Sequence, residues 1–245
     1  MEFSNITGFI FAAGLGTRLR PITLTTPKPL VKVHGKPILE YNLDLMLSLG
    51  IKDVVINAFH LKEQFKPYEG TYKGRLNVKV SYENIILGHG GGLVNALPFI
   101  NHDFILAING DTILTFQKEA LMTPFKRISS SSNKLDLEIA VMNDSVTPLA
   151  IQDGILIGIG NKKYIETKNE KNVKRYNALG LYLMKKTTLE LIKPEDGFMG
   201  IFGEDDLIDR LYEHKSVAKT FEINDYKRYE ITTPEDLEKI NSQNI

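Results

Sequence analysis

The chain has 245 residues, and its 30 lysines and arginines balance its 30 aspartates and glutamates, so its formal net charge is zero. A balanced charge gives no overall positive field that would attract nucleic acid or an anionic membrane, and we expect neither as a partner. The absence of cysteine excludes disulfides and thiolate sites, and the lack of a signal-peptide pattern or a bilayer-spanning apolar run favours a cytoplasmic protein.

The first half of the chain alternates strand patterns with helix patterns. Strands are expected at four apolar runs rich in β-branched residues, 8–13, 53–58, 78–82 and 104–108. A helix is expected over 36–49, where Leu39, Leu43 and Met46 fall on one face and Gly50 follows as a stop. A shorter helix is expected over 91–97. This alternation is typical of a mostly parallel sheet flanked by helices.

From residue 135 onward the pattern changes. Strands are expected at 135–142, 155–159 and 178–184, separated by polar or glycine turns that favour antiparallel pairing. Helices are expected at 204–211 and 234–240, the second with Thr233 as N-cap and Pro234 at its first position. We therefore predict an α/β fold with a smaller, more antiparallel second portion.

A glycine turn follows the first strand, in the segment FAAGLGTRLRP from Phe11 to Pro21. Gly14 and Gly16 let backbone N–H groups approach phosphates closely, and we expect room for a phosphate where a side chain on Gly16 would lie. Arg18 and Lys28 would add positive charge for a triphosphate. The turn is not a dinucleotide fingerprint, because Arg18 and Leu19 follow where a third glycine and a helix start would be. It is not a P-loop either, because a P-loop would place Gly-Lys-Ser/Thr at the end of the turn.

Two further segments carry chemistry after predicted strands, LGHGGGL at 87–93 and INGD at 108–111. An aspartate at the carboxyl end of a parallel strand lies on the rim where open α/β sheets bind ligands. Carboxylates are also the ligands that Mg²⁺ selects when it bridges to phosphates, which makes Asp111 a candidate metal ligand. An isolated histidine is more often structural, so His89 is assigned no catalytic role.

Together these segments resemble the sugar-1-phosphate nucleotidyltransferases, whose pattern is Gly-x-Gly-Thr-Arg-Leu, a short spacer and then Pro-Lys-Pro. The match is position by position at 14–19 and 27–29. The resemblance implies a Rossmann-like, nucleotide-diphospho-sugar transferase domain over 1–245, with a nucleotide-binding half at 1–134 and an acceptor-binding half at 135–245. The stretches 57–65 and 91–98 look most like the short single-domain uridylyltransferases that act on N-acetylmuramate 1-phosphate.

The resemblance also implies roles for individual residues. Catalysis would rest on Arg18, Lys28 and Asp111, and Mg²⁺ on Asp111 and Glu230. The nucleotide would be bound by the glycine turn, its basic residues and the second glycine loop: Ala12, Ala13, Gly14, Gly16, Thr17, Arg18, Lys28, Gly88 and Gly90. The acceptor would contact Asn177 and Gly180, within the strand-like stretch YNALGLY.

The implied reaction joins UTP, CTP or GTP to a sugar 1-phosphate, giving an NDP-sugar and pyrophosphate. The chain departs from the family pattern at Glu230, where aspartate is usual, and it lacks the Glu-Lys-Pro sugar-binding segment. Phosphocholine cytidylyltransferases carry a similar Tyr-Glu-Ile stretch, so a phosphorylated non-sugar acceptor stays an alternative. A silent sugar-nucleotide-binding regulatory protein is another, which the retention of Arg18, Lys28 and Asp111 disfavours. The nucleobase, the acceptor and assembly into a homo-oligomer stay open.

Glu230 itself has two predicted arrangements. We favour a carboxylate that reaches the same Mg²⁺ as Asp111, because the Thr233 cap holds the following helix in the family's register. The alternative has Glu230 pointing away, paired with Arg228 or Lys227.

Overall fold

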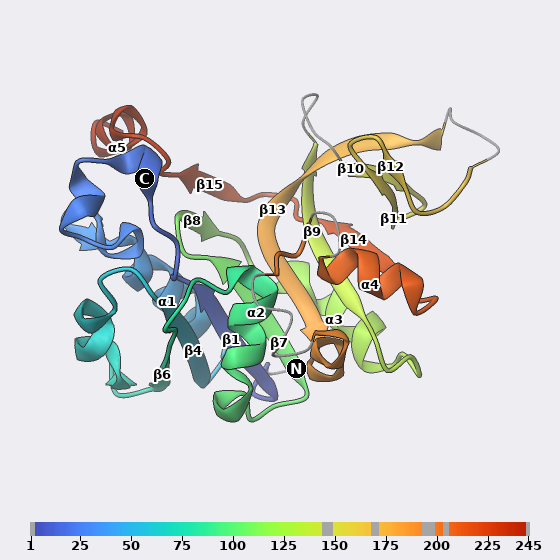
Figure 1. The fold of residues 1–245 in the computed structure, drawn as a ribbon, viewed down its shortest axis with the longest axis horizontal. Coiled ribbons are helices and arrows are strands. Elements are labelled where there is room, and N and C mark those ends of the chain that lie inside the picture. The colour runs from blue at the N-terminus through green and yellow to red at the C-terminus, as the bar shows by residue number, and fades with distance from the viewer. Residues whose placement is uncertain (1–2, 144–148, 168–171, 193–198, 203–205, 244–245) are drawn as a thin grey trace.

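The computed structural model describes residues 3–143, 149–167, 172–192, 199–202 and 206–243. Within these residues, the centre is an 11-stranded sheet (Figure 1). Its strands are β1 (Ile6–Phe11), β4 (Asp53–Ala58), β5 (Gly70–Tyr72), β6 (Leu76–Tyr82), β7 (Phe104–Asn109), β9 (Leu137–Asn143), β10 (Leu149–Gln152), β11 (Ile155–Ile159), β12 (Lys162–Lys163), β13 (Lys174–Lys185) and β14 (Ala218–Glu222). Their order is β10-β11-β14-β9-β13-β7-β1-β4-β6-β5, with β12 beside β11.

The parallel part of the sheet consists of β7, β1, β4 and β6, as the sequence predicts. Phe11 of β1 pairs with Asn57 of β4 and with Asn109 of β7, so these three residues stand side by side near the carboxyl ends of their strands. The first strand begins two residues earlier than expected and ends at Phe11. It ends there because the Ala12 N–H leaves the ladder and donates to the Asn57 side chain at 2.7 Å.

Five α-helices lie in the described part of the chain, namely α1 (Ile38–Ser48), α2 (Gly88–Asn95), α3 (Met122–Ser129), α4 (Leu207–Glu213) and α5 (Pro234–Asn241). The helix expected at 91–97 runs instead from Gly88 to Asn95, so its predicted start was wrong by about one turn. It can start earlier because the Gly90 N–H, in the first turn, donates to the Met199 carbonyl. Part of the expected helix at 204–211 lies outside the described residues. None of these helices could cross a membrane, being too short or too polar.

Side chains alternate between the two faces of the sheet, and each face has its own core. From β1, Ile6 and Ile10 pack into the cluster that also contains Leu39 and Leu43 of α1. Phe9 and Phe11 pack into the cluster that contains Leu93 of α2 and residues of α4. Helices therefore cover both faces, and the predicted α/β class is confirmed (Figure 1).

The second half extends the same sheet, with mixed strand directions. β13 runs antiparallel to β7 and β9, whereas β14 is parallel to β9. The pairing of β13 with β9 shifts register between Ala178 and Tyr182. Two small ribbons complete the fold, β2 (Lys32–Val33) with β3 (Lys36–Pro37), and β8 (Thr112–Thr115) with β15 (Lys227–Glu230). The second ribbon brings the late part of the chain back beside Asp111.

Candidate active site

A hollow of about 420 Å³ lies at the carboxyl ends of β1, β4 and β7. Its lining consists of Phe11, Ala12, Ala13, Gly14, Arg18, Lys28, Pro29, Asn57, Ile86, Gly88, His89, Asn109, Gly110, Asp111 and Glu230. We name it the strand-end hollow. Ligands of open α/β sheets bind at this edge, since the strand ends and the following loops meet there.

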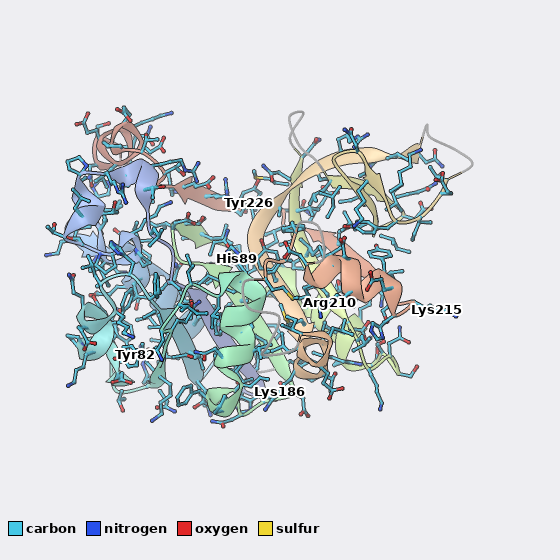
Figure 2. All side chains as sticks on the ribbon, viewed as in Figure 1. Tyr82, His89, Lys186, Arg210, Lys215 and Tyr226 are labelled. Atoms are coloured by element: carbon cyan, nitrogen blue, oxygen red, sulfur yellow. The ribbon has the colours of Figure 1, made fainter. Side chains whose placement is uncertain are left out.

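A larger hollow of about 710 Å³ lies beside Phe104, at the amino end of β7, and beside Lys185 and Lys186. Figure 2 shows Lys186 near the opposite end of α2 from His89, so the two hollows are well separated. We assign the functional site to the smaller hollow for two reasons. It lies at the carboxyl ends of the parallel strands, and Arg18, Lys28 and Asp111 converge there.

The centre of the strand-end hollow is an ion pair between Lys28 and Asp111. The Lys28 Nζ lies 2.7 Å from Oδ2 of Asp111, and the two residues are 83 positions apart in the sequence. The side chain of Lys28 is 11% exposed and that of Asp111 is 28% exposed. Thr112 donates from its hydroxyl to Oδ1 of Asp111 at 3.2 Å. Two predicted catalytic residues are thus in direct contact, and Arg18 lines the same hollow.

The predicted nucleotide-binding residues divide into two groups. Six of them line the strand-end hollow, namely Ala12, Ala13, Gly14, Arg18, Lys28 and Gly88. The lining does not include Gly16, Thr17 or Gly90. The Gly90 N–H is already used, since it donates to the Met199 carbonyl at 2.7 Å.

Gly16 does not leave the room for phosphate that we expected. Its φ is +62°, and a Cβ there would lie 2.8 Å from Cγ2 of Thr23 and 3.2 Å from Cβ of Lys28. The Thr23 hydroxyl also donates to the Gly16 carbonyl at 2.7 Å. The expectation was wrong because the turn presents Gly16 to the protein, whereas a Cβ on Gly14 would meet nothing within 4 Å.

This difference gives a first prediction. Gly16→Ala should lower the free energy of unfolding by about 1–3 kcal/mol, the usual cost of a non-glycine residue at positive φ. Gly14→Val should leave the melting temperature nearly unchanged and weaken NTP binding, because its side chain would enter the hollow. Thermal melts and calorimetric titration with a non-hydrolysable NTP measure both effects. A Gly16→Ala protein as stable as the parent would contradict the packing argument.

Glu230 lies next to Asp111 through the β8–β15 ribbon. It pairs with Thr112 across the ribbon, and the Ile231 N–H donates to the Asp111 carbonyl at 3.2 Å. Both carboxylates line the strand-end hollow. However, Oε2 of Glu230 is 2.8 Å from Nη2 of Arg228. The ribbon therefore brings the backbone of Glu230 beside that of Asp111, while the Glu230 side chain makes the ion pair of the alternative arrangement.

Within the described residues, no group of three or more histidines, aspartates and glutamates could hold a metal. Asp111 and Glu230 supply two hard oxygen donors on one hollow. This donor set fits Mg²⁺, which is commonly held by one or two carboxylates and completes its octahedron with waters and phosphate oxygens.

The two predicted acceptor residues lie outside the lining of the hollow. Asn177, on β13, pairs with Met142 near the end of β9. Gly180, with φ of +83°, lies in the register shift of β13, where a Cβ would be 3.0 Å from Nδ2 of Asn109. Because Asn109 lines the hollow, Gly180 borders the site through that side chain, and Asn177 does not.

Three residues that were given no role belong to the site or border it. His89 lies at the first turn of α2 (Figure 2), with its ring in edge contact with Phe11 at 4.5 Å between centroids. Desolvation by the surrounding protein lowers the pKa of His89, although the carboxylates of Asp111 and Asp206 oppose the shift. Burial therefore favours the neutral form of the imidazole.

Tyr182 is buried beside the hollow, and burial together with the Asp111 carboxylate raises the pKa of its hydroxyl. Asn57 is 2% exposed, and its side-chain oxygen accepts a hydrogen bond from the Ala12 N–H at the start of the glycine turn. A polar residue directly after the apolar run 54–56 of β4 was the sequence signal that could have found Asn57.

Comparison with known proteins identifies the chain's relatives. The mannose-1-phosphate guanyltransferase of Yarrowia lipolytica is 29% identical over 194 residues, covering 76% of this chain and 51% of the relative. The choline-phosphate cytidylyltransferase of Streptococcus pneumoniae is 51% identical over 67 residues, covering 27% of this chain and 29% of the relative. The chain spans about half the length of the guanyltransferases that it matches.

Among solved structures, the inositol-1-phosphate CTP transferase from T. maritima superposes with a TM-score of 0.71 at 16% identity, covering 99% of this chain and 97% of that chain. At this identity the likeness shows the fold alone. A family model described as nucleotidyl transferase matches residues 7–193 and so includes the glycine turn, Lys28 and Asp111. The chain belongs to the nucleotidyl transferase family.

Proposed function

We propose that this chain transfers a nucleotidyl group from an NTP to the phosphate of a sugar 1-phosphate, giving an NDP-sugar and pyrophosphate with Mg²⁺ as cofactor. The observation that carries the proposal is the convergence of Lys28, Arg18 and Asp111 on one strand-end hollow beside a glycine turn. Family membership and the sugar-phosphate substrates in the relatives' names support it. We propose one domain over 1–245, because one sheet joins residues 1–134 to residues 135–245.

The reaction needs positioning and charge neutralisation, since the acceptor's phosphate oxygen is already anionic at neutral pH. The backbone of Ala12–Gly14 would hold the phosphate chain, and Arg18 and Lys28 would neutralise the charge on the departing pyrophosphate. Mg²⁺ held by Asp111 and Glu230 would supply a Lewis acid for the α-phosphate.

The test is pyrophosphate release from each of the four common NTPs, with a panel of sugar 1-phosphates and phosphorylated aminoalcohols. We expect Mg²⁺-dependent release with one NTP and a sugar 1-phosphate, accompanied by the matching NDP-sugar. Tight NTP binding with no pyrophosphate from any acceptor would instead identify a silent regulatory protein.

A cytidylyltransferase for a phosphorylated aminoalcohol is the second candidate function. The observation that favours it is the 51% identity over 67 residues with the pneumococcal choline-phosphate cytidylyltransferase. Glu230, which replaces the aspartate usual in the sugar enzymes, points the same way. The same assay separates the two functions, because the second requires CTP with phosphocholine and no turnover with sugar 1-phosphates.

The assigned role of Glu230 gives a second prediction. Glu230→Gln should lower turnover by about tenfold or more and raise the Mg²⁺ concentration needed for half-maximal rate, because one of two carboxylate donors is lost. Glu238→Gln, an exposed change on α5, is the matched control. Turnover is measured across a Mg²⁺ titration for both variants. An unchanged titration curve for Glu230→Gln would mean that Glu230 does not bind the metal and serves only in its ion pair with Arg228.

A further inference from the structure

A buried carboxylate behind the strand-end hollow has no part in the proposed chemistry. Glu83 follows β6 and is 1% exposed. Its Oε1 accepts from Nδ2 of Asn57 at 2.7 Å, and its Oε2 accepts from the Leu87 N–H at 3.2 Å. Burial raises the pKa of Glu83, and these two hydrogen bonds oppose the shift. An ionised carboxylate in this position depends on both donors, since a buried charge without partners is costly.

The hydrogen bonds continue to the glycine turn. Oδ1 of Asn57 accepts from the Ala12 N–H at 2.7 Å, so Asn57 is bonded on both sides of its amide. Three hydrogen bonds in series therefore join the backbone at Ala12 to the backbone at Leu87 through two side chains.

The two ends of this hydrogen-bond series lie at two parts of the lining of the strand-end hollow. Ala12, Ala13 and Gly14 form one wall, and Gly88 and His89, directly after Leu87, form another. The backbone of α2 also packs on the pair, because a Cβ on Gly92 would lie 2.5 Å from Nδ2 of Asn57 and 2.8 Å from Oε1 of Glu83. The Asn57–Glu83 pair thus bridges the two walls.

We propose that Glu83 is a positioning residue which, through Asn57, holds the glycine turn and the 87–92 loop at the separation that an NTP requires. The inference rests on the proposed function, because it assigns the NTP to this hollow. Glu83 does not line the hollow. Its effect should therefore fall on NTP affinity, with little effect on the chemical step once the NTP is bound.

The direction of the hydrogen bonds allows the amide at position 57 and the carboxylate at position 83 to be exchanged. In Glu83→Gln, either orientation of the new amide puts its NH₂ group against a donor, Nδ2 of Asn57 or the Leu87 N–H. In Asn57→Asp, two carboxylates face each other in a buried place. In N57D/E83Q, the carboxylate at position 57 accepts from Ala12 and from the amide at position 83, whose oxygen accepts from Leu87. The double variant restores all three hydrogen bonds and keeps one negative charge.

The experiment measures KM for the NTP, KM for the acceptor, kcat and melting temperature in the parent, both single variants and the double variant. Each single variant should raise KM for the NTP by about tenfold, the effect of one unsatisfied buried hydrogen-bonding group, with kcat and the acceptor's KM changed by less than about threefold. The double variant should lower KM for the NTP below that of both single variants. It should stay above the parent's KM, because the negative charge moves from Glu83 to position 57, which lines the hollow. Glu63→Gln, an exposed change on the 3-10 helix Lys62–Tyr68, is the control.

Two results would overturn the inference. In one, the single variants lower the melting temperature but keep the parent's KM for the NTP, which would make the pair purely structural. In the other, the double variant is no better than the worse single variant. Either result leaves the proposed function intact, provided that the parent enzyme turns over. A parent protein that binds no NTP would instead refute the proposed function, and the positioning role with it.

Discussion

Replacing Asp111 with asparagine is expected to lower turnover by about a hundredfold or more. The change keeps the shape of the side chain and removes the charge that would hold Mg²⁺. It also removes the anionic partner of Lys28, whose Nζ lies 2.7 Å from Oδ2. Because Lys28 is only 11% exposed and would lose its charged partner, the change should also cost about 1–3 kcal/mol of stability. Initial rates and a thermal melt measure the two effects separately.

The matched control is Asp225→Asn. Asp225 is an exposed aspartate with φ of 59°, a conformation that asparagine also adopts readily. It should leave both the rate and the melting temperature unchanged. Near-normal, Mg²⁺-dependent turnover in Asp111→Asn would show that other groups hold the metal.

Replacing Lys28 with methionine is expected to lower turnover by a similar factor, about a hundredfold. Methionine keeps the apolar stem, which is almost fully buried, and removes the ammonium that would neutralise the departing pyrophosphate. Lys32→Met is the control, because Lys32 is exposed on β2, four positions further along the chain. The measurement is kcat and KM for the NTP in both variants.

Lys28 and Asp111 touch, so their effects should not add. We expect the double variant K28M/D111N to be about as slow as the slower single variant. If the rate losses of the two single variants multiply in the double variant, the residues act independently. A Lys28→Met enzyme that turns over near the parent's rate would show that Lys28 is not catalytic.

The sequence by itself determined the parallel strands and the motifs that follow them. Apolar runs of β-branched residues favour strands that are covered on both faces, and β1, β4 and β7 bear this out. β6 is also a parallel strand, but its side chains alternate between buried and exposed. Strand ends then place Gly14 and Asp111 on the same rim without further information. The capping box of α5 was equally local, since Thr233 and Asp236 satisfy each other's backbone within one turn.

Only the tertiary structure decided which side chains meet. The contact between Lys28 and Asp111 spans 83 positions, and the pairing of Asn57 with Glu83 spans 26. No periodicity encodes such contacts. The sequence likewise could not show which glycine of the turn faces the protein, because that depends on Thr23 packing against Gly16. Glu230 was placed by the β8–β15 ribbon, while its ion pair with Arg228 was set by side-chain geometry. Local pattern fixes elements and their ends, whereas contacts between elements depend on how the whole chain packs.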